Sequence, residues 1–179
     1  TKSSFISIEI ILNLIKDPNI HAVCYRKIGN KLETSVYNQI KWAINALDLK
    51  AFFRYYKNPL KIEYIPTGQQ ILCLGLDDPE NSRSIKLEFG YIKILWFEEL
   101  KQFDGMKEIR DVKQSVVRGG DEALIFYSYN PPEDPRNWVN KEAKQNKLQR
   151  LVKHSTYLDV PPEWLGKPFF IEAEDLKNT

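Results

Sequence analysis

The stretch Tyr91-Ile-Lys-Ile-Leu-Trp-Phe-Glu-Glu-Leu100 decides the fold class of this chain. It follows Gly90 and begins with apolar residues that favour β-structure, which is typical of a strand buried on both faces in a parallel sheet. It then ends in two carboxylates, Glu98 and Glu99. Open α/β sheets bind their ligands at the carboxyl ends of strands, so this acidic pair is a candidate site.

Two interpretations fit the acidic pair. In the first, Glu98 and Glu99 begin a helix and interact with the positive end of its dipole. In the second, they form a Walker B element, in which Glu98 holds Mg²⁺ through its water shell. Glu99 would then orient the water that attacks the γ-phosphate of ATP. The rest of the chain has to distinguish these interpretations.

Composition restricts the classes of protein to consider. With 179 residues, of which 42% are hydrophobic, one folded domain is expected. The formal net charge is only +2, so any nucleic-acid binding requires a local basic patch. Cys24 and Cys73 lie in apolar, strand-like runs and are expected to be buried free thiols, which fits an intracellular setting. No apolar run reaches membrane-spanning length, and no secretory signal is present.

Secondary-structure signals alternate along the chain. Strands are predicted at 20–25, 52–56, 62–65, 70–76, 91–97, 123–128 and 153–158, and helices at 2–16, 32–47, 100–117 with a weak break at Gly105, 137–149 and 171–176. This alternation predicts an α/β fold with a parallel or mixed sheet covered by helices on both faces. The strand at 123–128 also ends in polar residues, Ser128 and Asn130, so three strands could direct polar groups to one crevice.

The first residues resemble the tail of a P-loop. In that motif a lysine at a helix start reaches the β- and γ-phosphates and the next hydroxyl binds magnesium, as Lys2 and Ser3 would here. Simple N-capping by Ser3 or Ser4 explains the same residues. The order of the motifs favours the P-loop, because Lys-Ser, an apolar strand with paired acids and a Ser-x-Asn strand follow one another as in RecA-like ATPases with inserted strands.

Several motifs together resemble one family, the large terminase subunit of tailed bacteriophages, of the PBSX-like kind. The resemblance covers essentially the whole chain. Its residues are Thr1 to Ser7, Gly90-Tyr91 with Trp96 to Glu99, Ser115 with Arg118-Gly119-Gly120, Tyr127 to Pro132, and His154 to Asp159.

The resemblance implies the ATPase domain of a motor that packages double-stranded DNA into a procapsid. Residues 1–179 would then be a single RecA-like P-loop domain, a three-layer sandwich, without the C-terminal nuclease domain of the family. ATP as substrate and Mg²⁺ as cofactor are implied. So are a ring of identical subunits, a portal protein, a small terminase subunit, the bacterial host cytoplasm and no membrane. A non-catalytic P-loop-like module for DNA binding or oligomer contact is the alternative.

The resemblance also assigns roles to individual residues. Thr1, Lys2, Ser3 and Ser4 would bind nucleotide, Ser3 and Glu98 would bind magnesium, Glu99 would be catalytic, and Ser128 and Asn130 would couple hydrolysis to movement. Thr1 replaces the usual glycine and Glu98 the usual aspartate. Glu98 and Glu99 are therefore expected within reach of Lys2 and Ser3.

The beginning of the chain leads to a further expectation. The opening helix lacks a start methionine and begins in its own first turn, so residue 1 is interpreted as a cut. A glycine-rich loop and the strand that feeds it are expected before Thr1, with that strand beside residues 123–128. Otherwise the sheet would have to rearrange or pair with another chain, because buried backbone groups need partners. A strand at 123–128 paired on both sides within this chain would contradict this expectation.

Other polar residues have two interpretations each. Arg26 and Arg118 are either arginine fingers or solvated surface residues. Lys141, Lys144, Lys147 and Arg150 recur at helical spacing and either face DNA phosphates or form a solvated helix face. Asp77, Asp78 and Glu80 either bind a cation or belong to a polar loop.

Overall fold

The computed structural model describes residues 2–77, 85–161, 163 and 165–177. These residues divide into two compact units, which are treated separately below. Residues 3–145 form the larger unit, and Lys2 groups with the residues from Asn146 onward. Among the expected site residues, Thr1, Asp78 and Glu80 lie outside the described part of the chain.

Helices and strands alternate along the larger unit, as the sequence predicts. The helices are α1 (Lys2–Lys16), α2 (Asn38–Ala46), α4 (Met106–Val116) and α5 (Trp138–Ala143), and the strands are β1 (Ile20–Arg26), β2 (Phe53–Lys57), β3 (Leu60–Tyr64), β4 (Gln69–Gly75), β5 (Tyr91–Glu98) and β6 (Leu124–Ser128). Short helical turns occupy Gly29–Lys31, Glu33–Tyr37, Lys50–Phe52 and Leu100–Gln102. The smaller unit contains a turn at Tyr157–Asp159 and α6 (Lys167–Lys177).

One mixed sheet of six strands organises the larger unit, in the order β2-β3-β4-β1-β5-β6. β4, β1, β5 and β6 run parallel to one another, whereas β2 and β3 form an antiparallel hairpin at one end. The α/β fold class and the mostly parallel sheet are therefore confirmed. β6 lies at the other end of the sheet and pairs with β5, and no second strand of the described residues pairs with it. A strand from outside this chain is expected beside residues 123–128, and pairing of β6 on both sides would contradict that expectation. Among the described residues such pairing is not found.

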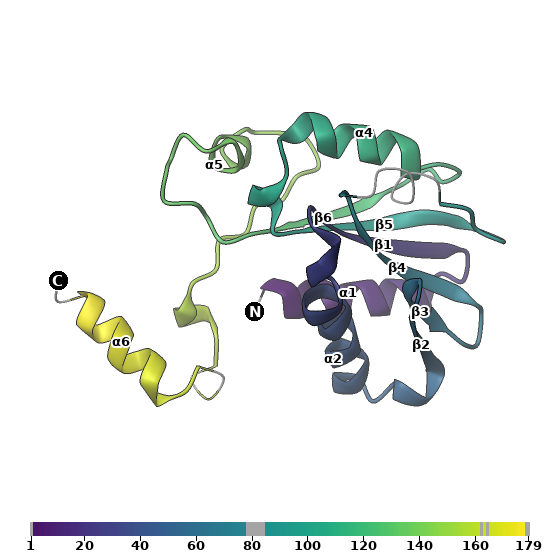
Figure 1. Ribbon diagram of the computed structural model, residues 1–179, viewed down its shortest axis with the longest axis horizontal. Coiled ribbons are helices and arrows are strands. Elements are labelled where there is room, and N and C mark those ends of the chain that lie inside the picture. The colour runs from purple at the N-terminus through teal and green to yellow at the C-terminus, as the bar shows by residue number, and fades with distance from the viewer. Residues whose placement is uncertain (1, 78–84, 162, 164, 178–179) are drawn as a thin grey trace. The chain divides into compact units, whose positions relative to one another are not determined.

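The central strands separate two hydrophobic cores. Alternate residues of β5 point to opposite faces of the sheet, as the period of two requires. Ile94 and Trp96 pack with α1 and α2 on one face, and Leu95 and Phe97 pack with α4 and α5 on the other. Figure 1 shows these two pairs of helices on opposite sides of the strands. β1 is buried along its whole length, as expected for a strand in the middle of such a sandwich.

The carboxyl end of α1 is attached to the start of the sheet by one buried side chain. The side-chain nitrogen Nε2 of Gln69, the first residue of β4, lies 3.0 Å from the carbonyl oxygen of Leu14. The same nitrogen lies 2.7 Å from the carbonyl oxygens of Asp17 and Ile20. Carbonyl groups at a helix end have no partner within the helix, so Gln69 supplies one for Leu14. The chain then reverses at Asp17 to Asn19, and β1 runs back along α1.

Two elements after β6 differ from the prediction. The helix expected at 137–149 ends at Ala143, and Gln149 has a positive φ of 60°. Residues 153–156 have no regular structure, so the strand expected at 153–158 is wrong. Its β-favouring residues are followed by a turn in which the backbone N–H of Thr156 donates to the Asp159 carboxylate over 2.7 Å. That hydrogen bond gives the backbone a local partner instead of a strand neighbour.

Candidate nucleotide site at the carboxyl edge

Three neighbouring parallel strands end in polar residues at one edge of the sheet. β1 ends in Arg26, β5 in Glu98 and β6 in Ser128. Glu98 lies opposite Ser128 in the register, and Arg26 follows the pair Tyr25 and Phe97 by one residue. All three side chains continue the rows that face α1 and α2, because Cys24, Trp96 and Phe126 pack on that face. The expected convergence of polar groups from these strands is therefore present.

Arg26 and Glu98 form an ion pair that is almost enclosed. The Nε atom of Arg26 lies 3.0 Å from Oε2 of Glu98, and the two side chains are only 10% and 15% exposed. The angles at these two atoms do not suit a hydrogen bond, and neither atom has a hydrogen-bond partner elsewhere among the described residues. The terminal nitrogen of Arg26 donates to Oγ of Ser35 over 2.9 Å. The interpretation of Arg26 as a solvated surface arginine is therefore wrong.

Glu98 has an unusual electrostatic environment for a carboxylate. Burial raises the pKa of Glu98, the positive charge of Arg26 opposes this rise, and the negative charge of Glu99 adds to it. A raised pKa means that the protein stabilises the ionised form of Glu98 less well than water does. A second cation near this carboxylate would favour the ionised form.

Glu99 lies in a different environment although it is the next residue. Its backbone is left-handed, with φ 57° and ψ 50°, a conformation that side chains other than glycine and asparagine rarely adopt. The strand therefore ends abruptly, and Oε2 of Glu99 lies 4.0 Å from the Lys101 ammonium. The single turn Leu100–Gln102 follows without a side-chain cap from Glu99, and α4 begins only at Met106. The helix-start interpretation is thus wrong for Glu98, the last residue of β5, whereas Glu99 directly precedes this short helical turn.

The first turn of α1 lies toward the same edge of the sheet. α1 has 15 residues and is about 22 Å long, which matches the length of about 23 Å for the seven residues of β1. Because α1 precedes β1 by a tight reversal, Ser3 lies at the edge where β1 and β5 end. Lys2 is the first helical residue, so Ser3 and Ser4 are inside the helix and neither is its N-cap. The distance from Lys2 to Glu98 stays a prediction.

Ser128 and Asn130 occupy different environments. The indole nitrogen of Trp96 donates a buried hydrogen bond of 2.8 Å to Oγ of Ser128. Ser128 is only 5% exposed, so its hydroxyl belongs to the interior of the sheet. Asn130 lies two residues beyond the end of β6 and is exposed. Of the two predicted coupling residues, Ser128 therefore lies in the core beside Glu98, and Asn130 lies at the surface two residues later.

The residues at this edge suit a magnesium ion. Mg²⁺ prefers hard oxygen ligands, and the Ser3 hydroxyl and Glu98 carboxylate both offer oxygen. Oε2 of Glu98 is buried and accepts no hydrogen bond, although the Arg26 guanidinium lies 3.0 Å away, so a metal ion or a metal-bound water would share this oxygen with Arg26. In a bound complex the ion would supply charge neutralisation for the phosphates, with Ser3 and Glu98 as its protein partners.

Charged residues next to this edge are engaged in other contacts. The ammonium of Lys27 lies 2.7 Å from Asp104 and 2.6 Å from Glu108. Burial opposes the charge on Lys27, but these hydrogen bonds outweigh it, and the pKa of Lys27 is raised. Asp77 accepts hydrogen bonds of 3.0 Å from the backbone N–H of Gly29 through both carboxylate oxygens. This contact supports the polar-loop interpretation of Asp77.

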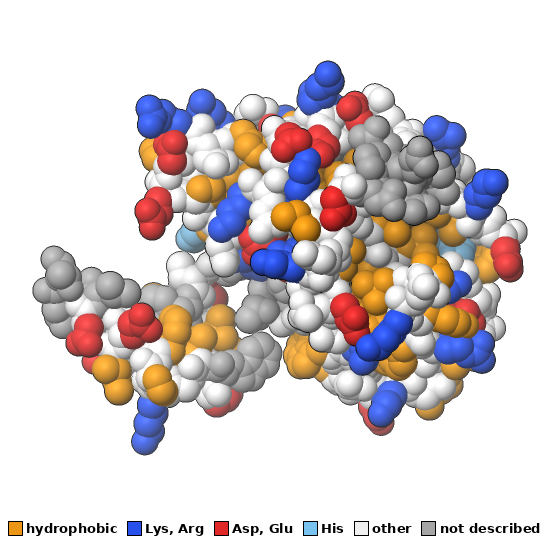
Figure 2. Space-filling model, viewed as in Figure 1, with side chains coloured by type: hydrophobic (Ala, Val, Ile, Leu, Met, Phe, Trp, Pro, Cys, Tyr) orange, Lys and Arg blue, Asp and Glu red, His pale blue; other side chains and the backbone are white. Residues whose placement is uncertain are grey.

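The basic residues expected on one helix face do not share one. Lys141 lies in α5 and Lys144 caps it, but Lys147 and Arg150 follow beyond its end and belong to the smaller unit. In the view of Figure 2, lysine and arginine side chains are interspersed with acidic ones rather than gathered in one patch. The structure therefore contradicts the helical spacing on which the proposed DNA-facing stripe depends.

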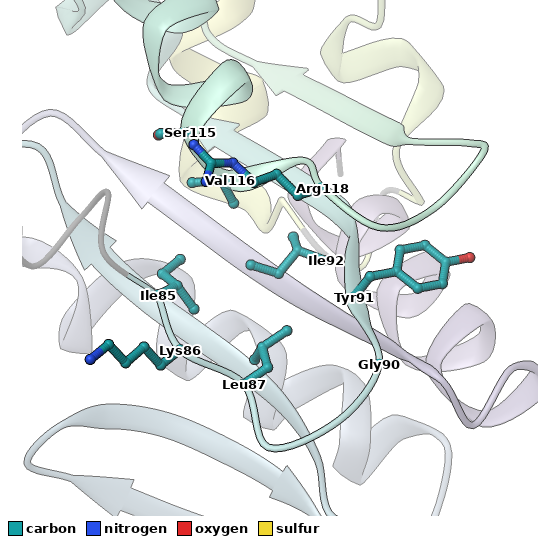
Figure 3. Close-up of a pocket in the computed structure, with 9 residues that line it drawn as sticks. All are labelled: Ile85, Lys86, Leu87, Gly90, Tyr91, Ile92, Ser115, Val116 and Arg118. Carbon is teal, nitrogen blue, oxygen red and sulfur yellow. The ribbon is translucent and has the colours of Figure 1, made fainter.

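A pocket of about 580 Å³ lies at the opposite end of β5 from Glu98. In Figure 3 the side chains of Ile85, Leu87 and Ile92 extend toward one another, and Lys86 extends away from them. Ser115 and Arg118, which belong to one of the family-like motifs, also line the pocket, and Arg118 is exposed. This motif therefore lies apart from the carboxyl edge.

The sequence indicates Arg26 and Glu98 separately, but it predicts neither their pairing nor a role for Ser35. Oγ of Ser35 donates to the carbonyl oxygen of Lys31 over 2.8 Å while it accepts from Arg26. Nothing in the local sequence distinguishes Ser35 from an ordinary helical serine. Cys24 and Cys73, by contrast, are both buried and free, as expected, and are neighbours across β1 and β4.

Comparisons with known proteins agree with this architecture. The family model for the phage terminase large subunit matches residues 1–179. The chain is 37% identical over 183 residues to the terminase large subunit of Bacillus phage SPP1, a match that covers 99% of this chain and 43% of that protein. The chain thus spans less than half the length of this relative.

Two solved structures share the fold at low sequence identity. The large terminase of a thermophilic bacteriophage has a TM-score of 0.56 at 15% identity, covering 76% of this chain and 32% of that one. A chain of the bacteriophage Phi-29 viral genome packaging motor assembly has a TM-score of 0.50 at 12% identity, covering 74% and 40%. Among the described helices, none has the length and apolar character needed to cross a bilayer. The match over the whole chain, together with the identity to the SPP1 protein, shows that this chain belongs to the phage terminase large subunit family.

Proposed function

We propose that this chain is the ATP-hydrolysing region of a motor that drives double-stranded DNA into a procapsid. The observation that carries the proposal is the position of Glu98, a nearly buried carboxylate at the end of a central parallel strand. It lies on the sheet face covered by α1, whose first turn lies toward the same edge. Family membership supports the same activity for the complete protein.

In this proposal each residue has a separate task. Thr1, Lys2, Ser3 and Ser4 hold the phosphates at the helix start, where backbone N–H groups and the helix dipole favour anions. Ser3 and Glu98 hold the magnesium of the substrate, and Glu99 orients the attacking water. The left-handed backbone at Glu99 supports a separate role, because such conformations are often retained at functional sites and the strand pattern of β5 stops at this residue.

Ser128 and Asn130 are proposed to transmit the state of the nucleotide to the DNA-moving surface. Ser128 lies opposite Glu98 in the register and is held by Trp96, which precedes Glu98 by two residues. A change in the position of Glu98 therefore reaches β6 through both the strand pairing and this hydrogen bond. DNA, further copies of the subunit, the portal protein and the small terminase subunit are the proposed partners. The bacterial cytoplasm is the proposed setting.

Hydrolysis of ATP by the full-length protein tests this function. We expect hydrolysis that requires Mg²⁺ and that falls at least roughly 100-fold in Glu99→Gln, the range of effect for a residue that positions or activates the nucleophile. Glu122→Gln is the matched control, because the Glu122 side chain is 81% exposed and its carboxylate lies 3.8 Å from the ammonium of Lys93. DNA binding or self-association without hydrolysis by the unmodified protein would instead favour the non-catalytic alternative.

A further inference from the structure

Arg26 has a position that the proposed hydrolysis mechanism leaves unexplained. It is only 8% exposed, although a guanidinium is strongly disfavoured in an apolar interior without a counter-charge. Its ionic partner among the described residues is Glu98, the carboxylate assigned to magnesium. Lys27, the next residue, points its charge to Asp104 and Glu108 instead.

The position of the guanidinium is fixed by its surroundings. Ser35 accepts a hydrogen bond from Arg26 and donates one to Lys31, within the short helical segment Glu33–Tyr37 that leads into α2. Gly29, the first residue of the turn Gly29–Lys31, donates its backbone N–H to both carboxylate oxygens of Asp77. Arg26 therefore has little freedom to withdraw from the carboxyl edge when another cation approaches Glu98.

We propose that Arg26 is a positioning residue that occupies Glu98 when no metal is bound and competes with magnesium for this carboxylate. The inference rests on the proposed function, since it assumes that Glu98 receives the ion. Two cations that share one carboxylate oppose each other's binding, and the opposition is reciprocal. Arg26 thus holds the Glu98 side chain in place before the substrate arrives, and it weakens magnesium binding afterwards.

Magnesium dependence of nucleotide binding tests the competition directly. A fluorescent, non-hydrolysable ATP analogue is titrated against the full-length protein at a series of Mg²⁺ concentrations. We expect Arg26→Gln to lower the half-saturating Mg²⁺ concentration roughly fivefold or more, the lower range for coupled sites. Lys27→Gln, which removes a neighbouring charge that does not contact Glu98, is expected to leave it unchanged.

A second measurement examines the pair without nucleotide or metal. The urea midpoint is measured for Arg26→Gln, Glu98→Gln and the double variant. We expect the double variant to lose less than the sum of the single losses, because each single change leaves a buried charge without its partner. Additive losses would overturn the pairing whether or not the protein binds ATP.

The outcomes separate this inference from the proposed function. Magnesium-dependent binding by the unmodified protein with an unchanged or raised half-saturating concentration in Arg26→Gln would overturn the competition alone. Absence of any magnesium-dependent binding by the unmodified protein would overturn both. If Arg26→Gln does not fold, Ser35→Ala retains the charge but loosens it, and a smaller decrease in the same direction is then expected. No change in Ser35→Ala would count against the inference.

Discussion

The indole nitrogen of Trp96 and the hydroxyl of Ser128 are joined by a buried hydrogen bond of 2.8 Å between two adjacent parallel strands. Trp96 is completely buried, so its N–H has no access to water if Ser128 is removed. The bond therefore connects the strand that ends in Glu98 to the strand that leads to Asn130 by more than backbone pairing.

Ser128→Ala is expected to lower the free energy of unfolding by about 1–3 kcal/mol, because the indole N–H of Trp96 is left buried without an acceptor. Trp96→Phe removes the donor as well, so the double variant should lose less than the sum of the two single losses. Urea unfolding of the three variants measures this coupling. Additive losses would mean that the hydrogen bond contributes nothing specific.

Substitutions at Glu99 should separate backbone strain from chemistry. Asparagine tolerates the left-handed conformation better than other side chains, so Glu99→Asn should leave stability equal or higher while hydrolysis is lost. Glu99→Val should lose hydrolysis and also about 1–3 kcal/mol of stability, because a β-branched residue is strained at positive φ. Thermal unfolding and ATP hydrolysis of both variants check the prediction. Equal stabilities for the two variants would contradict it.

His21 should make the stability depend on pH. Its Nδ1 accepts from the backbone N–H of Gln70, so Nε2 carries the proton that is donated to the carbonyl oxygen of Phe89. Burial lowers the pKa of His21 below its usual value of 6.5, and the hydrogen bond to Phe89 only partly opposes this. The unfolded chain therefore takes up a proton near pH 6.5 that the folded chain binds only at lower pH, so stability falls as pH drops below about 6.5.

Comparison of unfolding free energies at about pH 7.5 and about pH 5.5, on either side of the ordinary histidine pKa, tests the role of His21. His21→Gln should lose less stability between these values than the unmodified protein, because one group that titrates differently in the two states is gone. His154→Gln, at an exposed histidine, is the matched comparison variant. An identical dependence in His21→Gln and the unmodified protein would show that other groups are responsible.

Gly90 should tolerate no side chain. Its φ is +64°, and an added Cβ would lie 2.1 Å from the carbonyl oxygen of Asn19, which is backbone and cannot move away as a side chain can. Gly90→Ala should therefore cost more than about 2 kcal/mol, the sum of strain and a steric clash. Gly105→Ala is a suitable comparison, because Gly105 also has positive φ but no atom within 4 Å of an added Cβ. Chemical denaturation should show a larger loss for Gly90→Ala.

DNA contact by the basic residues after Pro135 remains a prediction. If Lys144 and Lys147 contact phosphates, replacing both with alanine should weaken DNA binding and lower the slope of log affinity against log salt by roughly two units. Lys57→Ala, on the β2–β3 hairpin and paired with Glu33, should leave the slope unchanged. An unchanged slope in the double variant would favour the alternative interpretation, in which neither lysine contacts DNA.

The sequence predicts local elements well where a clear terminator accompanies the periodic pattern. The helix at 2–16 ends before Asp17-Pro18, and the strand at 91–98 begins after Gly90, as the structure confirms. The sequence-based prediction fails at two segments. The helix predicted at 137–149 ends at Ala143, and the strand predicted at 153–158 is replaced by a turn with a local hydrogen bond from Thr156 to Asp159.

Predictability of the candidate site has a different limit. Residue types at strand ends indicate that Glu98 lies at the ligand edge, because topology brings parallel strands together there. Which charges then pair depends on side chains from segments distant in sequence, as Arg26, Ser35 and Glu98 illustrate. The left-handed backbone of Glu99 has no signal in residue type, since glutamate does not favour that conformation.

The three carbonyl oxygens around Gln69 have a consequence for how α1 opens. Helix ends normally fray, and their amides exchange hydrogen with solvent long before the core does. Here the last turn of α1 is bound to the first residue of β4, which lies 55 residues beyond Leu14 in the chain. Opening of the last turn therefore also has to break the buried hydrogen bond to the Gln69 side chain. Its amides should exchange as slowly as those of β4, and Gln69→Ala should let that end exchange quickly while β4 stays protected.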